Sequence, residues 1–400
     1  MKFAQVALLV GILLRANMGL SAECNVLTPT YLQEGVASFS GQMHVVADFN
    51  QDGNDDFVAL NAVLSKADSA GYDLKDSLNY YASDLAQFSL AAGDLNGDGK
   101  KDLVRSYYSG HGGRNIEILL NDGQGNFTHP QDESRGLYYN GTPGIIYNHG
   151  LTLADVNNDG LLDIISTART KVSVLLGKGN GTFSEPVLSA AAAATTEHVL
   201  VADLDKDGLP DLVTAVADLK RDGQARSHGR TDFLVYKGLG DGRFSLKQKF
   251  TVDAHVTSAD MGKINQAGDV GLILTGQRGK LSGRGGIYVY KHNRAQGEFE
   301  EIYNDNNELL NRRVLHATVG DFNEDGVLDL VFLRSQTVSL RLNDGQGKLD
   351  KSYETTNPSY EVFSDQDVLV GHFKNLSSQI TVYGKQKLQF FSVNKTCLKK

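Results

Sequence analysis

The stretch DVNNDGLLD at Asp155–Asp163 decides the fold, because the same nine-residue pattern returns along the chain. Matching stretches are DFNQDGNDD at Asp48–Asp56, DLNGDGKKD at Asp94–Asp102, DLDKDGLPD at Asp203–Asp211 and DFNEDGVLD at Asp321–Asp329. Two eroded copies fill the remaining intervals, at residues 259–274 and 371–383. Self-similarity at a period of about 50 residues is typical of a repeat architecture.

Short apolar runs flank each motif. HVLVAD leads into the first aspartate of the fourth copy and DLVTA starts at its last aspartate, and the other copies have similar neighbours. Runs of four to six residues rich in Val, Ile, Leu and Phe, bounded by glycine turns, indicate strands. Each motif therefore connects two strands of a β-hairpin, whereas the acidic loop of an EF-hand lies between helices.

The motif has the chemistry of a calcium loop. Carboxylate or amide oxygens at positions one, three, five and nine converge on one point, and glycine at position six permits a sharp turn. Hard oxygen donors suit Ca²⁺ better than zinc or copper. An Asx-rich turn without metal is the alternative, and five complete copies favour calcium. The predicted ligands are Asp48, Asn50, Asp52, Asp56, Asp94, Asn96, Asp98, Asp102, Asp155, Asn157, Asp159, Asp163, Asp203, Asp205, Asp207, Asp211, Asp321, Asn323, Asp325 and Asp329. The eroded copies are expected to bind no metal.

A glycine turn ending in an apolar residue follows most motifs, as in NDGQGNF at Asn121–Phe127 and GLGDGRF at Gly238–Phe244. With these turns the chain resembles the FG-GAP repeat family, which includes the integrin α-subunit head and many exported bacterial proteins. The resemblance implies an all-β fold, a seven-bladed β-propeller with about five structural calcium ions in the hairpin loops. The expected blades start near residues 42, 88, 149, 198, 255, 316 and 367.

The two ends of the chain carry further predictions. Residues 1–22 have the basic start, apolar run and small residues of a secretory signal peptide, so we expect a secreted or periplasmic protein with its propeller at 23–400. The last repeat has only three strand-like runs, and an N-terminal strand at 26–40 is expected to complete it. An exported protein favours a disulfide between Cys24 and Cys397, and two unpaired thiols are the alternative.

Composition narrows the function classes. The 400 residues carry a net charge of -9, which argues against nucleic-acid binding because phosphate would be repelled. The acidic loops account for much of this charge. After the signal peptide no segment is apolar enough for membrane insertion. The 43 glycines with only 6 prolines argue against a proline-rich disordered chain and indicate many tight turns.

Basic residues gather in the loops expected at the end of the ring opposite the motifs. Five histidines stand shortly before motifs, at the expected starts of the innermost strands near the same end. A ligand or metal site is one interpretation of these histidines, and repeated packing residues are the alternative. The predicted ligand-binding residues are His44, His149, His198, His255, His316, Arg114, Arg226, Arg230, Arg278 and Arg284.

Three function classes compete. The first is a binding module that holds an anionic polysaccharide or another protein on the basic end. The second is a polysaccharide lyase acting on uronate-containing glycans, with arginine neutralising the uronate and His or Tyr moving the proton. The third is an adhesion protein. Because the sequence identifies no catalytic residues, the binding module is our prediction, and an enzymatic role is left open.

Overall fold

The computed structural model describes most of the chain between residues 26 and 398. The described segments are 26–34, 44–59, 62–67, 71–75, 86–109, 113–130, 150–168, 171–189, 196–217, 229–278, 284–305, 314–334, 337–356, 367–373, 378–384 and 387–398. The proposed signal peptide at 1–22 and Cys24 lie outside these segments.

Within the described residues, strands form seven four-stranded antiparallel sheets, which we number as blades one to seven. Blade one contains β2 (His44–Ala47), β3 (Asp56–Ala59), β4 (Ala62–Ala67) and β5 (Gly71–Lys75). Blade two contains β6 (Ala86–Gly93), β7 (Asp102–Ser109), β8 (Gly113–Asn121) and β9 (Phe127–Thr128). Blade three contains β10 (Leu151–Ala154), β11 (Asp163–Ala168), β12 (Lys171–Leu175) and β13 (Val187–Ser189). Blade four contains β14 (Thr196–Ala202), β15 (Asp211–Ala217), β16 (Thr231–Gly238) and β17 (Phe244–Val252). Blade five contains β18 (His255–Lys263), β19 (Val270–Arg278), β20 (Arg284–Asn293) and β21 (Glu298–Asp305). Blade six contains β22 (Val314–Gly320), β23 (Asp329–Arg334), β24 (Thr337–Leu342) and β25 (Lys351–Thr356). Blade seven contains β26 (Asp367–Phe373), β27 (Ser378–Gly384), β28 (Lys387–Val393) and β1 (Leu27–Glu34).

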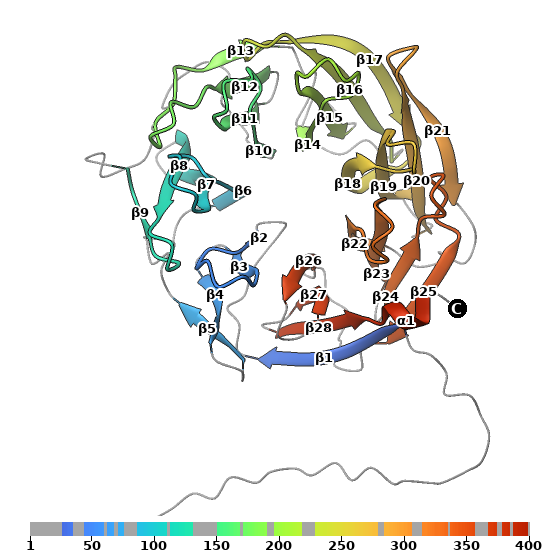
Figure 1. Cartoon of the computed structure of the whole chain (residues 1–400). Helices are drawn as coiled ribbons and strands as arrows, with labels where there is room; N and C mark the ends of the chain where they lie inside the picture. The colour runs from blue at the N-terminus through green and yellow to red at the C-terminus, as the bar shows by residue number, and fades with distance from the viewer. Residues whose placement is uncertain are drawn as a thin grey trace, which may run out of the picture.

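The blades stand in a closed ring. Their first strands contact one another in the cyclic order β2, β6, β10, β14, β18, β22, β26 and back to β2, and these strands lie nearest the centre in Figure 1. The prediction of an all-β propeller is confirmed.

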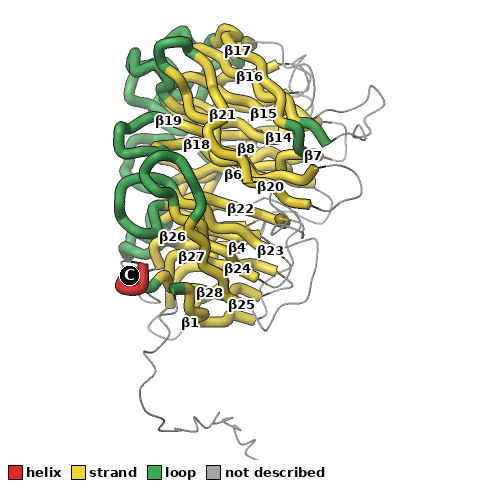
Figure 2. The backbone as a smooth tube through the Cα atoms, turned by 90° about the vertical axis from the view of Figure 1, so that its right-hand side faces the viewer, coloured by secondary structure: helices red, strands yellow, loops and turns green. Residues whose placement is uncertain are grey.

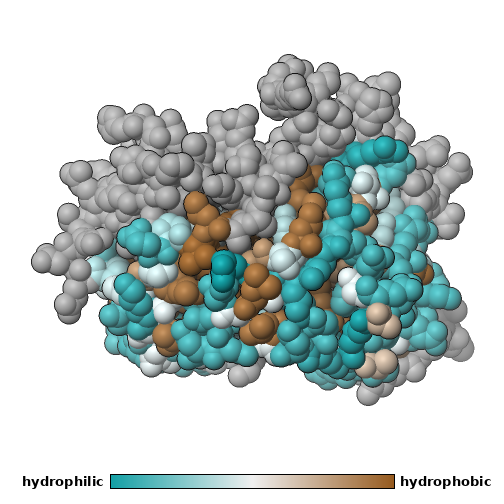
Figure 3. Space-filling view, turned by 90° about the horizontal axis from the view of Figure 1, so that it is seen from above, coloured by the Kyte–Doolittle hydropathy of each residue, from teal (hydrophilic) through white to brown (hydrophobic). Residues whose placement is uncertain are grey.

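The apolar runs become strands because both of their faces are buried between blades. Ile164 packs toward blade two with Val104 and Ile118, while the next residue, Ile165, packs toward blade four with Leu212. Successive side chains of a strand point to opposite faces, so a sheet covered on both sides needs continuous rather than alternating hydrophobicity. Figure 3, which views the rim along β13 and β17, shows patches of hydrophobic residues within a mainly hydrophilic surface.

The first and last strands close the ring together. β1 pairs antiparallel with β28, and Leu27 lies opposite Val393. The N–H of Asn394 continues the pairing by donating to the carbonyl of Val26 at 2.8 Å. The sequence placed this strand at 26–40; the structure shows it at Leu27–Glu34, and residues 35–40 lie outside the described segments.

The short helix α1 (Lys395–Leu398) follows and buries Cys397, which is 6% exposed. Cys24 is two residues before Val26, and because it is not among the described residues the Cys24–Cys397 disulfide stays a prediction. Within the described segments, no helix has the length and hydropathy needed to cross a bilayer.

Candidate metal loops and the opposite end of the ring

All five complete motifs lie at one end of the ring. They join β2 to β3, β6 to β7, β10 to β11, β14 to β15 and β22 to β23, which are the first and second strands of their blades. Figure 2 shows the described loops gathered on this side. The glycine at position six has a positive φ in every copy, for example 85° at Gly160 and 83° at Gly326, as the sharp turn requires.

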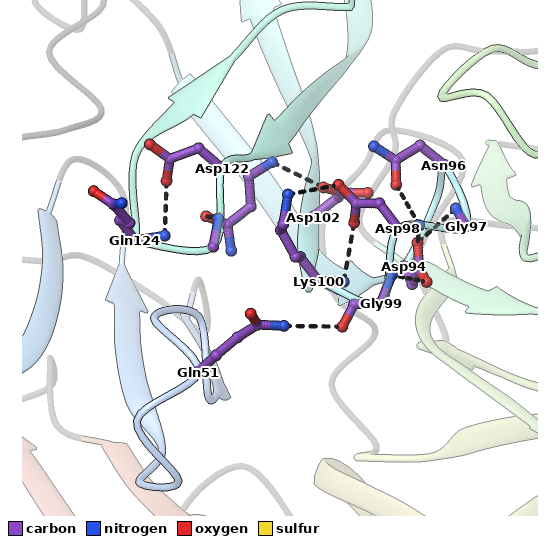
Figure 4. Close-up of polar contacts among 12 residues, drawn as sticks. Gln51, Asp94, Asn96, Gly97, Asp98, Gly99, Lys100, Asp102, Asp122 and Gln124 are labelled. Carbon is purple, nitrogen blue, oxygen red and sulfur yellow. Dashed lines mark hydrogen bonds and ion pairs between the residues drawn. The ribbon is translucent and has the colours of Figure 1, made fainter.

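The first aspartate of each motif organises the loop around itself. In blade two the N–H of Asp98 donates to Asp94 Oδ1 at 3.2 Å, and the N–H of Gly99 donates to Asp94 Oδ2 at 2.8 Å (Figure 4). The same glycine-to-aspartate bond measures 2.8 Å in blades one, three and six and 2.9 Å in blade four. The loop backbone is therefore curled so that the oxygens of positions one, three and five are near one another.

The ninth aspartate has a different task. Asp102 is fully buried, and its Oδ2 accepts the N–H of Leu95 at 2.9 Å while its Oδ1 accepts the N–H of Asn121 at 2.8 Å. Asp163, Asp211 and Asp329 bond in the same way to the loop and to the glycine turn of their own blade. These carboxylates thus join the two repeated sequence elements, a link that the sequence did not reveal.

Burial makes the negative charge of the ninth aspartate costly. It raises the pKa of Asp56 and of Asp329 to about 7 and the pKa of Asp163 to about 6, and the other loop carboxylates raise these values further while backbone N–H bonds oppose the change. Burial likewise raises the pKa of Asp102 and Asp211. A nearby divalent cation is the kind of partner that would lower such values, because it favours the ionised carboxylate.

The donors fit calcium in their chemistry. In blade four, carboxylate oxygens of Asp203, Asp205 and Asp211 all lie within 4.8 Å of one another. In blade one, Oδ1 of Asp56 is buried without a hydrogen-bond partner. A cluster of hard oxygens, as in blade four, and a buried carboxylate oxygen that lacks a donor, as in blade one, are each features of a Ca²⁺ site.

Side chains at position four connect neighbouring loops. Gln51 of loop one donates from Nε2 to the carbonyl of Gly99 in loop two at 3.3 Å (Figure 4), and Asn158 of loop three donates to the carbonyl of Gly208 in loop four at 2.8 Å. These bonds join loop one to loop two and loop three to loop four.

The eroded fifth copy closes its turn without a carboxylate cluster. Asn265 and Asp269 bond each other twice, each time at 2.9 Å, through side chain and backbone. Beside this turn, a shallow pocket of about 330 Å³ opens between blades five and six. The side chains of Asn265, Lys291, Gln346 and Lys348 line it together with Ile302. Its walls come from two blades, so the sequence did not predict it.

At the opposite end the structure describes part of the predicted histidine series. His198 of β14 and His255 of β18 lie near enough for their imidazoles to interact electrostatically. Burial lowers the pKa of His198 to about 4, and a charge on His255 lowers it further, so His198 is neutral at pH 7. His44 begins β2 and His316 lies in β22, whereas His149 is outside the described segments.

The predicted arginines are described to different extents. Arg230 Nε lies 3.1 Å from Asp253 Oδ1, and both side chains are exposed. For Arg278 and Arg284 the structure gives the backbone, in which they face each other across β19 and β20, and Arg114 faces Tyr108 across β7 and β8. Arg226 lies outside the described segments.

Comparison with known proteins identifies the repeat. Residues 94–166 and 155–214 match the FG-GAP-like repeat. The chain contains FG-GAP-like repeats. The matched FG-GAP-like segments run from the acidic loop of blade two into β15 of blade four. No curated protein matches the sequence.

Two solved structures are similar to this chain. One is an Agrocybe aegerita lectin that recognises non-reducing terminal N-acetylglucosamine, with a TM-score of 0.55, 18% identity, and coverage of 80% of this chain and 81% of the lectin. The other is the V. cholerae biofilm matrix protein Bap1, with a TM-score of 0.39, 13% identity, and coverage of 93% and 92%. At these identities the likeness concerns the fold.

Proposed function

We propose that the protein is an exported recognition module, a propeller held in shape by calcium, that binds a glycan rich in negative charge or a partner protein. The observation that carries the proposal is the pocket between blades five and six. It is formed where the fifth copy lacks the acidic ligands that the five complete copies have.

Calcium has a structural role in this proposal. In blades two, three, four and six each oxygen of the buried ninth carboxylate accepts one backbone N–H and keeps a lone pair for an ion, so these carboxylates stabilise hairpins rather than hold a substrate. About five Ca²⁺ ions would be held by oxygens at positions one, three, five and nine. What the ion supplies is charge compensation for clustered carboxylates, which otherwise repel one another.

The pocket offers groups that suit a hydroxyl-rich or anionic ligand. Two lysine side chains and the amides of Asn265 and Gln346 line it, while Ile302 adds an apolar contact. Its walls are tied together by Gln266, whose N–H donates to the carbonyl of Gly345 at 3.2 Å and whose Nε2 donates to the carbonyl of Asp325 at 2.9 Å. A pocket with fixed walls binds at a smaller entropic cost than one that must be ordered.

Of the two proposed partner classes, a glycan and a protein, the lectin of similar fold supports the glycan. Recognition at the opposite, arginine-rich end is the other location consistent with the sequence, so the experiment separates the two ends.

The test is a glycan array run with four proteins: the unchanged chain, Lys291→Ala/Lys348→Ala, Arg278→Ala/Arg284→Ala and Lys249→Ala. Lys249 lies on β17 beside Asp232, and its variant controls for loss of a surface charge. We expect Lys291→Ala/Lys348→Ala to weaken binding at least about tenfold and Lys249→Ala to leave it unchanged.

Loss of binding only in Arg278→Ala/Arg284→Ala would place the ligand at the opposite end and contradict the pocket. Uronate-containing polysaccharides are incubated in parallel, and unsaturated products detected by absorbance would show a lyase instead of a binding module. No glycan binding and no product would remove the carbohydrate from the proposal and leave a protein partner, to be tested with the same variants.

A further inference from the structure

The loop of blade four differs from the other four complete loops in its charge. Its third position is Asp205, where the other copies have asparagine. It therefore has four carboxylates at ligand positions instead of three. Three of them, those of Asp203, Asp205 and Asp211, form the cluster that lies within 4.8 Å.

A lysine from the same blade lies against this cluster. Lys237, near the end of β16, has its Nζ 2.6 Å from Asp207 Oδ2 and also in contact with Asp205 Oδ2. Both carboxylates occupy predicted ligand positions. In blade two, by comparison, Lys100 Nζ bonds to the single carboxylate of Asp98 at 3.0 Å.

The position of Lys237 is apolar in blades two, three and six. It directly precedes Gly238, whose N–H bonds the ninth carboxylate Asp211. The residues that precede the equivalent N–H donors of blades two, three and six are leucines packed with the hydrophobic core: Leu120, Leu176 and Leu342. Compared with blades two, three and six, blade four thus has an additional negative charge at Asp205 and an additional positive charge at Lys237, and the two side chains are in contact.

We infer that Lys237 is an internal cation that competes with calcium for the carboxylates of loop four, so that this loop takes calcium only at a higher concentration than the loops of blades three and six. The inference rests on the proposed calcium sites. An ammonium in contact with two ligand carboxylates occupies oxygens that the ion needs, and it repels a divalent ion that approaches. When calcium is absent, the same ammonium offsets the repulsion among the four carboxylates.

Hydrogen exchange measured by mass spectrometry on the full chain, across a series of free calcium concentrations, follows each loop separately. Peptides covering 203–211 report on loop four, and peptides covering 155–163 and 321–329 are references within the same molecule. We expect loop four to reach half protection at about tenfold higher calcium than the references, because the ammonium of Lys237 repels a divalent ion at short range.

The decisive variant is Lys237→Leu, which restores the residue used in the other blades. It should lower the half-protection concentration of loop four about tenfold and leave the references unmoved. Lys249→Leu removes the same charge from β17 and should shift no loop. Lys237→Met, with an unbranched chain, replaces the leucine variant if the latter does not fold.

Thermal melting provides a second readout, because the effect of Lys237→Leu on the melting temperature should differ between EGTA and excess calcium. In EGTA, Lys237→Leu should melt below the unchanged chain, because four carboxylates lose their internal cation. In excess calcium it should melt at the same temperature or higher. A purely structural lysine would lower the melting temperature in both conditions, and that result overturns the inference.

The inference is also overturned if loop four of the unchanged chain is protected at the same calcium concentration as the references. It is likewise overturned if Lys237→Leu does not change the calcium concentration at which loop four is half protected. If none of the loops responds to calcium, the calcium proposal itself fails and the inference fails with it. A response of loops three and six without a shift in loop four defeats the inference alone.

Discussion

The main-chain N–H of Asn121 donates a 2.8 Å hydrogen bond to Oδ1 of Asp102, which ties the glycine turn after β8 to the acidic loop before β7. The side chain of Asn121 adds to this link, because its Nδ2 donates to the carbonyls of Phe49 at 2.7 Å and Lys101 at 2.9 Å. Phe49 belongs to blade one, so a single asparagine joins a turn, a loop and the neighbouring blade.

Asp102→Asn should therefore cost about 2–3 kcal/mol of unfolding free energy, because a buried amide nitrogen would face backbone N–H groups that need an acceptor. Urea unfolding with EGTA present measures this without a contribution from bound calcium. Asp241→Asn, at an exposed turn of blade four, is the control and should change stability by less than about 1 kcal/mol. Equal effects of the two variants would contradict the role given to Asp102.

Removal of calcium should lower the melting temperature strongly. Extracellular calcium sites bind at about 0.1–1 mM, and with about 1 mM calcium a site with Kd near 0.1 mM adds about 1.4 kcal/mol. Five such sites add about 7 kcal/mol, which is comparable with the stability of a whole domain. The measurement is a melting curve in calcium and in EGTA, with magnesium as the control ion. An identical curve in all three would refute structural calcium.

Arg105 and Glu117 form a buried ion pair between β7 and β8, with side chains 2% and 3% exposed, and His129 Nε2 lies 3.5 Å from Glu117 Oε1. Glu117→Gln should cost about 3–5 kcal/mol because it leaves a buried guanidinium without its counter-charge. Replacing both residues with leucine should cost less than either single change. A double-mutant cycle measured by urea unfolding gives the coupling energy between Arg105 and Glu117, and additive effects of the two changes would contradict the ion pair.

Stability should fall below neutral pH partly because of His198. Its folded pKa of about 4 is below the unfolded value of 6.5, so the unfolded chain binds more protons between these values. The stabilising contribution is complete above pH 6.5 and is lost as the pH falls toward 4. The unfolding free energy of His198→Gln should fall by about 1–3 kcal/mol less than that of the unchanged chain as the pH falls from 6.5 toward 4. The readout is unfolding free energy at pH 7.5, 6 and 5, with His255→Gln as the comparison.

The ends of the chain should be joined covalently. Thiol titration of the unfolded, unreduced protein should find no free thiol, and reduction should lower stability by about 4 kcal/mol because the closed loop is long. Two titratable thiols before reduction would exclude the Cys24–Cys397 bond.

The sequence was most informative where contacts are local. The nine-residue motifs determine their own loop geometry, so Asp94 and Gly99 could be placed in a hairpin turn from their spacing alone. The continuous apolar runs likewise predicted strands. Features built from distant segments were missed: the bond from Asn121 to Asp102, the contact of Lys237 with Asp205 and the pocket beside Lys291. Each joins residues of different strands or blades, and a sequence pattern does not fix those distances.

The predicted ligand end shows the same limit. Basic residues were assigned there from their order along the chain, yet Arg230 lies beside Asp253, which is 23 residues later and outside the loops that were considered. A count of charges per loop cannot anticipate a neutralising partner from the connection between β17 and β18.

Pairing of β1 with β28 has a consequence for how the chain is made. Among the described strands β1 leaves the ribosome first and its partner β28 leaves last, about 360 residues later, which takes roughly 20–70 s at ordinary elongation rates. Throughout that time β1 has an unsatisfied hydrogen-bonding edge, and blade seven cannot be completed from either end alone. A chaperone that shields residues 27–34 during synthesis would therefore favour correct closure over pairing with a neighbouring chain.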